Sequence, residues 1–197
     1  MDSNFFAMMS RMKYIERWAL MRNSQSENIS EHSLEVSMLA HALAVIGKRR
    51  LGGKVDPEKA ALVGLYHDST EIITGDMPTP IKYYNKEIQG AFKEIETLAA
   101  NRLLDMLPSD LREEYEGIFF PNVGDEHMWK LVKAADKLSA LIKCIQEEKA
   151  GNTEFTSAKK AIMETLQKMN LEEVNIFIKE FLPAYYKTLD ELNLPYN

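Results

Sequence analysis

Apolar residues recur every three or four positions along almost the whole chain, and this spacing limits the chain to helices. In the first segment the recurring residues are Phe5, Met8, Met12, Ile15 and Ala19, which predicts one helix over 5–19. No stretch alternates between apolar and polar residues between turn pairs, so no strand is predicted. Because the sequence has no internal repeat and no low-complexity linker, we expect one all-α domain over residues 1–197.

Capping residues, glycine and proline mark where the predicted helices begin and end. Ser30 is the expected N-cap of a helix that runs to about Lys48. Asp56 followed by Pro57 predicts a helix that continues to Ile73. Pro78 and Pro80 predict an irregular segment at 75–80. Further helices are predicted at about 86–106, at 126–149, at 155–169 and at 172–192, and a short one begins at 109. The last helix is expected to be kinked or split at Pro183.

Charge, hydropathy and cysteine usage exclude several classes of protein. The net charge is −6, and an acidic chain without a basic stripe is a poor binder of nucleic acid polymers. The longest apolar run, residues 39–47, is far too short to span a membrane, and we expect no secretion signal. The single cysteine, Cys144, lies in an apolar stripe and cannot form an internal disulfide. We therefore expect a cytoplasmic protein with Cys144 in its core.

Three ionisable residues interrupt the apolar helix predicted over 57–73. His67 and Glu71 have the i,i+4 spacing that places two side chains on one helix face, and Asp68 lies three residues before Glu71. Burying unpaired charge is costly, so this cluster requires either charged partners or a metal ion.

Two further residues point toward the same interior. His32 continues an inward face of its helix, and Asp136 stands among apolar residues in the middle of another. Two imidazoles and two carboxylates suit a divalent ion such as Mn, Co, Fe or Zn, and four protein ligands leave two positions of a six-coordinate ion for water and substrate. The alternative is that His32 is a hydrogen-bonded core residue and that Asp136 pairs with Lys133 or Lys137.

The other two histidines are expected to lie outside this cluster. His41 follows His32 by nine residues, which is half a turn around the helix, so we expect a structural role for it. His127 stands beside Asp125 and Glu126 near a helix start, which favours a surface position.

The order His32, His67–Asp68, Asp136 resembles the H…HD…D signature of the HD-domain metal-dependent phosphohydrolases, an all-α superfamily. Within it, the chain resembles the bacterial 5′-deoxynucleotidases of the YfbR type nearly end to end, fading only after about residue 190. The motifs that carry this resemblance are Arg-Trp-Ala-Leu-Met-Arg-Asn (17–23), Ser-Glu-His-Ser (30–33), Tyr-His-Asp-Ser-Thr-Glu (66–71), Gly-Asp-Met-Pro-Thr-Pro (75–80) and Lys-Ala-Ala-Asp-Lys-Leu (133–138).

The resemblance implies an HD-domain helical bundle with a metal-site core over about residues 28–140. It implies hydrolysis of deoxyribonucleoside 5′-monophosphates to deoxynucleosides and phosphate, selectivity against ribonucleotides, assembly as a homodimer, and cobalt or manganese as the metal used in assays. The metal ligands that it implies are His32, His67, Asp68 and Asp136.

The same resemblance assigns roles to other residues. Glu71 handles the attacking water, Arg17 orients the phosphate, and Trp18 packs against the sugar. Asp76 acts on the departing 5′-oxygen or binds the 3′-hydroxyl, and the sequence does not separate these two roles. The implied catalytic residues are thus Glu71, Arg17 and Asp76, and the implied substrate contacts are Arg17, Trp18, His32, Asp68, Asp76, Met77, Pro78, Thr79 and Asp136.

Other functions are compatible with the same pattern. The scaffold also suits a phosphodiesterase or a dNTP triphosphohydrolase, although no histidines remain for a second metal ion, which argues against two-metal phosphodiesterases. From different classes, the chain could be a non-catalytic nucleotide-binding scaffold or a structural bundle with buried ion pairs.

Overall fold

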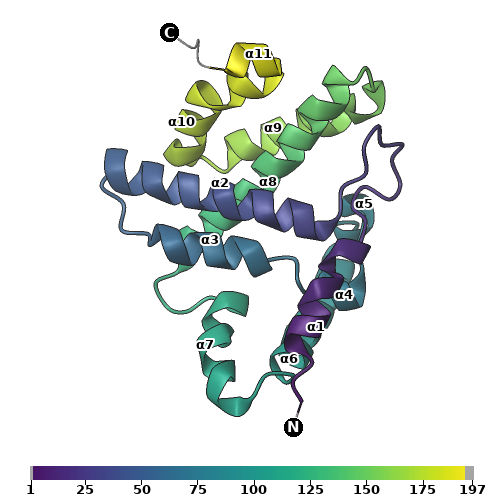
Figure 1. Cartoon of the computed structure of the whole chain (residues 1–197), viewed down its shortest axis with the longest axis vertical. Helices are drawn as coiled ribbons and strands as arrows, with labels where there is room; N and C mark the ends of the chain where they lie inside the picture. Colours follow the sequence, from purple (N-terminus) through teal and green to yellow (C-terminus); the bar gives the residue numbers. More distant parts are fainter. Residues whose placement is uncertain (1, 194–197) are drawn as a thin grey trace.

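Two long helices, α2 (Ile29–Arg50) and α8 (Glu126–Lys149), pack against each other at the centre of the molecule (Figure 1). The structure is a computed structural model and describes residues 2–193. Helix α3 (Pro57–Tyr66) lies beside α2, while α9 (Thr156–Lys168) packs on α8 and α10 (Glu172–Glu180) packs on α2. The predicted all-α domain is confirmed: residues 2–193 contain no strand, only an isolated bridge between Glu16 and Asn28.

The main core lies where these five helices meet. Its buried apolar side chains follow the predicted stripes, and they include Val36, Leu39 and Leu43 of α2 and Leu131, Leu138 and Leu141 of α8. Gly64 lets α2 and α3 approach closely, because a Cβ atom there would lie 3.0 Å from the Cα atom of Ser37. Close packing at Gly64 fixes the distance between the start of α2 and the end of α3.

A second, smaller core supports the C-terminal end of α3. It joins α1 (Phe5–Met9), α6 (Lys86–Leu104) and α7 (Ser109–Phe119) around Phe5, Leu103 and Leu104. The ring of Tyr66, the last residue of α3, packs against this cluster. The chain that follows Tyr66 is therefore held between the two cores.

The remaining helical elements are short. They are the 3₁₀ helices η1 (Ser10–Tyr14), η2 (Thr153–Phe155) and η3 (Leu182–Tyr186), and the α-helices α4 (Glu71–Thr74), α5 (Thr79–Lys82) and α11 (Leu189–Leu192). Pro183 does split the last predicted helix, because α10 ends at Glu180 and η3 follows. No helix among residues 2–193 combines the length and hydropathy that crossing a membrane requires.

The predicted helix over 5–19 is wrong beyond Tyr14. The chain becomes extended at Ile15 and runs beside the residues that precede α2. The backbone N–H of Ile29 donates to the carbonyl of Ile15 at 2.9 Å, and that of Arg17 donates to the carbonyl of Glu27 at 2.8 Å. These bonds replace helical ones.

The predicted helix over 57–73 is also wrong, because it is interrupted at residues 67–70. Helix α3 ends at Tyr66, whose carbonyl accepts a hydrogen bond from the Ser69 hydroxyl at 2.7 Å. Such a side-chain bond competes with the next helical bond and favours a turn. The chain resumes as α4 at Glu71.

Several boundaries differ from prediction by a few residues, and two of them have a clear local cause. The N-cap of α2 is Asn28 rather than Ser30: its side chain accepts from the N–H groups of Ser30 and Glu31, and Glu31 accepts from the N–H of Asn28. The irregular segment predicted at 75–80 ends at Pro78, because Thr79 begins α5 and a proline is tolerated in a first helical turn.

Candidate metal centre

Three elements bring the four predicted metal ligands together. His32 lies in the first turn of α2, His67 and Asp68 lie in the turn between α3 and α4, and Asp136 lies in the middle of α8. The ligand atoms of His32, His67 and Asp68 all lie within 4.8 Å of one another. The Oδ1 atom of Asp136 is 3.2 Å from Nε2 of His32.

The turn at residues 67–70 allows two consecutive side chains to converge. Successive residues of an α-helix point about 100° apart. In the turn, however, Nε2 of His67 and Oδ2 of Asp68 lie 3.1 Å apart. The i,i+4 argument that placed His67 and Glu71 on one helix face does not apply, because the helix is broken between them.

The nitrogen atoms of the two imidazoles fit a metal site. In both His32 and His67 the Nε2 atom is buried and has no hydrogen-bond partner, which is costly unless an electron-pair acceptor is present. The opposite nitrogen is occupied in each ring: Nδ1 of His67 donates to the carbonyl of Gly64 at 2.7 Å, and Nδ1 of His32 lies 3.0 Å from the Ser139 hydroxyl. In its neutral form each ring therefore offers an Nε2 lone pair to the interior, as a divalent cation requires.

Charges around the cluster keep its carboxylates ionised. Burial opposes ionisation of Asp68, but His67 and His32 beside it hold its pKa well below the ordinary value. Burial also opposes ionisation of Asp136, but Lys137 and His32 outweigh it and lower the pKa of this carboxyl. Burial and the charge of Arg17 work against a proton on His32, yet Asp136 and Asp68 raise its pKa. A metal ion must therefore displace that proton in order to bind.

The chain before α2 places Arg17 at this cluster and Trp18 beside Glu27. The Arg17 guanidinium lies 3.2 Å from Oδ2 of Asp68 and 3.4 Å from a carboxylate oxygen of Glu27. Trp18 donates its indole N–H to Glu27 at 2.8 Å, and its ring centre is 5.2 Å from that of Phe155. Its backbone φ of +58° is strained for a bulky residue, and such strain persists only where surrounding contacts impose it.

Two more carboxylates complete the acidic group. Glu71 is buried and one of its oxygens has no hydrogen-bond partner; burial, followed by the charges of Asp68 and Asp76, raises its pKa to about 9. Burial also raises the pKa of Asp76, which lies near the Trp18 backbone. Of the predicted substrate loop, Asp76, Met77 and Pro78 are half-buried and Thr79 is exposed.

Comparison with known proteins identifies the family. The family model described as 5′-deoxynucleotidase YfbR-like matches residues 4–185. A 5′-deoxynucleotidase of Vibrio cholerae is 48% identical over 192 residues, which cover 98% of this chain and 99% of that protein. The chain belongs to the YfbR-like family.

Solved structures agree with this family at the level of the fold. An HD-domain phosphohydrolase from Listeria innocua superimposes with a TM-score of 0.78 at 22% identity, over 92% of this chain and 88% of that one. The HD phosphohydrolase of cyanophage S-2L, solved with dA and one catalytic Zn²⁺ ion, gives a TM-score of 0.64 at 21% identity, over 92% and 96% of the two chains. The His and Asp side chains assembled here suit a divalent metal in the same fold.

Sequence reasoning missed Glu27 and Ser139 as residues of the site. Glu27 holds both Arg17 and Trp18, and no spacing signal pointed to it because it precedes the helix. Ser139 was detectable, since it lies three residues after Asp136 on the same helix. Lys137 lies 3.0 Å from Oδ2 of Asp136, so the ion pair considered as an alternative to metal binding exists beside the cluster.

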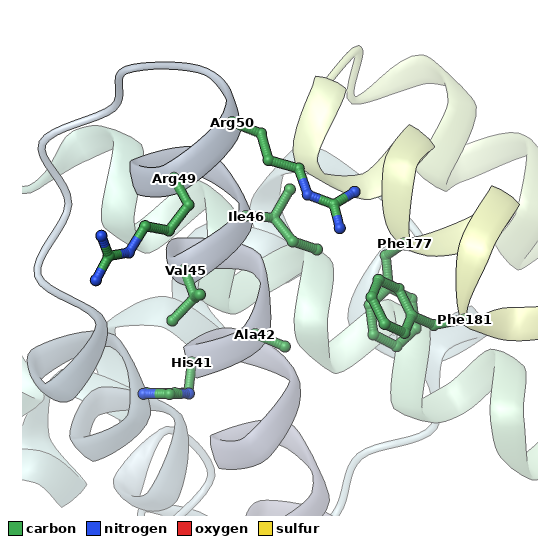
Figure 2. Close-up of a pocket in the computed structure, with 8 residues that line it drawn as sticks. All are labelled: His41, Ala42, Val45, Ile46, Arg49, Arg50, Phe177 and Phe181. Atoms are coloured by element: carbon green, nitrogen blue, oxygen red, sulfur yellow. The ribbon is translucent and has the colours of Figure 1, made fainter.

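The residues expected outside the site do lie elsewhere. His41 is exposed and, as Figure 2 shows, lines a groove formed with Phe177 and Phe181 of the C-terminal region. His127 is exposed and pairs with Glu173 at 2.8 Å. Cys144 is completely buried, as predicted, and burial raises the pKa of its thiol to about 11.

A buried ion pair anchors the loop between Trp18 and Glu27 to α8. Glu147, which is 1% exposed, accepts hydrogen bonds from Lys143, from the N–H of Ser24 at 2.8 Å and from Asn152 at 2.7 Å. Although burial opposes ionisation, these bonds lower the pKa of Glu147 to about 2. The loop that presents Arg17 and Trp18 is thus attached to the central helix.

We expect Glu147→Ala to lower the free energy of unfolding by about 3 kcal/mol, because Lys143 is left buried without its partner. The neighbouring Glu148→Ala, which removes an exposed ion pair with Lys159, is the control and should cost less than about 1 kcal/mol. Because the pKa of Glu147 is lower in the folded state, its ionised carboxylate stabilises the fold fully above the unfolded pKa of about 4.5. This stabilisation is lost as the pH falls toward the folded pKa of about 2. Urea titrations at pH 7 and pH 3 should therefore show a smaller effect of Glu147→Ala at pH 3.

Proposed function

We propose that this chain is a metal-dependent 5′-deoxynucleotidase that hydrolyses deoxyribonucleoside 5′-monophosphates and discriminates against ribonucleotides. The observation that carries the proposal is the convergence of two unpaired, buried Nε2 atoms with the carboxylates of Asp68 and Asp136. The names of relatives that match over 98% of the chain support the substrate class. The proposed domain is the whole chain, with the metal-site core at about residues 28–140.

The proposed metal ligands are His32, His67, Asp68 and Asp136, and Co or Mn is the proposed ion in assays. When bound, such an ion lowers the pKa of a water ligand and neutralises charge on a phosphate oxygen. The negative charge of Asp68 and Asp136 favours a cation between them. The Zn²⁺ in the cyanophage relative supports a single divalent ion in this fold.

Arg17 is the proposed phosphate-binding residue. Its guanidinium lies 3.2 Å from Oδ2 of Asp68, so a phosphate held at the cluster is within reach of the side chain. A guanidinium binds two phosphate oxygens through parallel N–H bonds. Arg17 would thereby orient the phosphate group and compensate the negative charge of that group.

Glu71 and Asp76 are the proposed proton-transfer residues. Burial and the charges of Asp68 and Asp76 make the ionised carboxylate of Glu71 a strong proton acceptor, and a cation bound at the cluster would favour that ionised form. Glu71 would take the proton of the attacking water. Asp76, on the loop next to Trp18, would protonate the departing 5′-oxygen or bind the 3′-hydroxyl.

Trp18 is the proposed selector of deoxyribose, with Met77, Pro78 and Thr79 closing on the nucleotide. Its indole is immobilised by Glu27 and Phe155 and therefore forms a rigid apolar wall. A rigid wall excludes a ribose 2′-hydroxyl by contact, whereas a merely apolar pocket rejects an added hydroxyl only about 100-fold.

A homodimer is the proposed assembly. Helices α2 and α3 expose four large apolar side chains that the single chain leaves in contact with water: Leu34, Met38, Leu62 and Leu65. An exposed apolar surface on two neighbouring helices supports contact with a second copy.

The test of the function is a phosphate-release screen with nucleoside mono-, di- and triphosphates and a cyclic dinucleotide, each with Mn²⁺, Co²⁺, Zn²⁺ and Mg²⁺. We expect release from deoxynucleoside 5′-monophosphates only. Hydrolysis of dNTPs or of the cyclic dinucleotide instead would assign the chain to one of the other enzyme classes of this scaffold.

We expect Trp18→Ala to reduce the ratio of kcat/KM for dAMP to that for AMP by about 10- to 100-fold, chiefly by admitting the ribonucleotide. Arg17→Ala is the control, because a lost phosphate contact weakens both substrates alike and leaves the ratio unchanged. An unchanged ratio in Trp18→Ala would restrict Trp18 to packing and assign sugar selection to residues 76–79.

A further inference from the structure

The imidazole of His32 is held from behind by two side chains that have no place in the reaction described above. Its Nδ1 atom lies 3.0 Å from the hydroxyl of Ser139, and that hydroxyl lies 2.6 Å from a carboxylate oxygen of Glu35. His32 and Glu35 belong to α2 and Ser139 to α8, so the three groups connect the two central helices. His32 and Ser139 are 1% and 0% exposed, so bulk water does not reach this contact.

The single hydroxyl hydrogen of Ser139 determines which nitrogen of His32 carries a hydrogen in the neutral ring. Ser139 has one hydroxyl hydrogen, and it donates that hydrogen to Glu35. The Ser139 oxygen is then an acceptor toward His32, so the imidazole must carry its hydrogen on Nδ1. In the neutral ring the Nε2 atom is left with a lone pair, and it is this atom that lies 3.4 Å from Asp68 and 3.2 Å from Asp136.

His67 also carries its hydrogen on Nδ1, because of a single backbone contact. Its Nδ1 atom faces the Gly64 carbonyl, which can only accept a hydrogen bond. For His32 the corresponding partner is a hydroxyl, which both donates and accepts. A hydroxyl alone would permit either protonated form of His32, and the Glu35 carboxylate removes that freedom by taking the hydroxyl hydrogen.

We propose that Ser139 and Glu35 are positioning residues that hold His32 with its hydrogen on Nδ1, so that Nε2 is available to the divalent cation. The proposal rests on the proposed metal site and extends it to two residues outside the four ligands. Partners behind a ligating histidine typically contribute about 10- to 100-fold to metal affinity.

The test is the dissociation constant for Mn²⁺ of the purified full chain, measured by competition with a chelator at pH 8. We expect Ser139→Ala to weaken Mn²⁺ binding by about 10- to 100-fold, and Glu35→Gln to weaken it by a smaller factor. Ser33→Ala is a matched control: Ser33 is equally buried and adjacent to His32, but its hydroxyl has no partner, so its removal should leave the affinity unchanged.

A second readout separates positioning from a loss of folding. In the metal-free protein at pH 8 with ¹⁵N-labelled histidine, NMR should show a hydrogen on Nδ1 of His32 in the wild type and in Ser33→Ala, whether or not Nε2 also carries the proton that Asp68 and Asp136 favour. In Ser139→Ala the Nδ1 hydrogen should be lost from part or all of the population. If Ser139→Ala does not fold, the same comparison with Glu35→Gln decides the question.

Each failure has a distinct signature. A wild-type protein that binds no Mn²⁺ would overturn the proposed metal site itself. A wild type that binds Mn²⁺ and releases phosphate from dAMP, with equal affinity in Ser139→Ala, would overturn only the role of Ser139 and Glu35.

Discussion

Asp68→Ala should abolish both metal binding and phosphate release. Oδ2 of Asp68 lies at the centre of the cluster, 3.1 Å from His67, 3.4 Å from His32 and 3.2 Å from Arg17. Its removal deletes one ligand and one unit of the negative charge that favours a cation. Metal content by elemental analysis and phosphate release from dAMP are the two measurements, and Asp110→Ala, which changes an exposed carboxylate on α7, should alter neither.

Removal of the metal from the wild type should have the same effect as Asp68→Ala, but reversibly. A strong chelator should eliminate activity, and added Mn²⁺ or Co²⁺ should restore it. The apparent metal affinity should fall as pH decreases from 8 to 6, because Asp68 and Asp136 raise the pKa of His32 and a proton then competes for the imidazole. Full activity after prolonged dialysis against chelator would exclude metal-dependent catalysis.

Glu71→Ala should lower turnover by about 10²–10⁴-fold while the metal content stays unchanged. Glu71 is not one of the four proposed ligands, which is why we expect the metal to remain. Near-normal turnover in this variant would remove Glu71 from the mechanism, and loss of metal would instead make it a ligand.

The stability of the metal-free protein gives an independent test of how Glu71 is buried. Its pKa is raised from 4.5 to about 9, so the folded state keeps a proton that the unfolded state releases above pH 4.5. The unfolding free energy therefore decreases as pH rises through this range. Glu71→Gln, which cannot ionise, should raise the Tm of the metal-free protein by more at pH 8 than at pH 5.

The sequence by itself determined the helical class and most of the long helices. The predicted bounds of α8, residues 126–149, are those of the structure, because a long apolar stripe on one face has only one stable orientation toward a core. The sequence also selected the residues of the candidate site, since ionisable side chains in apolar helices are few and costly. The family resemblance added Arg17 and Trp18, which periodicity alone placed in an ordinary helix.

Only the tertiary structure decided how these residues meet. The extended path of residues 15–17 depends on bonds to residues 27–29, and the turn at 67–70 depends on a side-chain bond to Tyr66 between two cores. Helical periodicity describes one segment at a time, so it cannot reveal a backbone partner from another segment. The contact behind His32 is the clearest case, because its partner Ser139 is 107 residues away in the chain and 3.0 Å away in space.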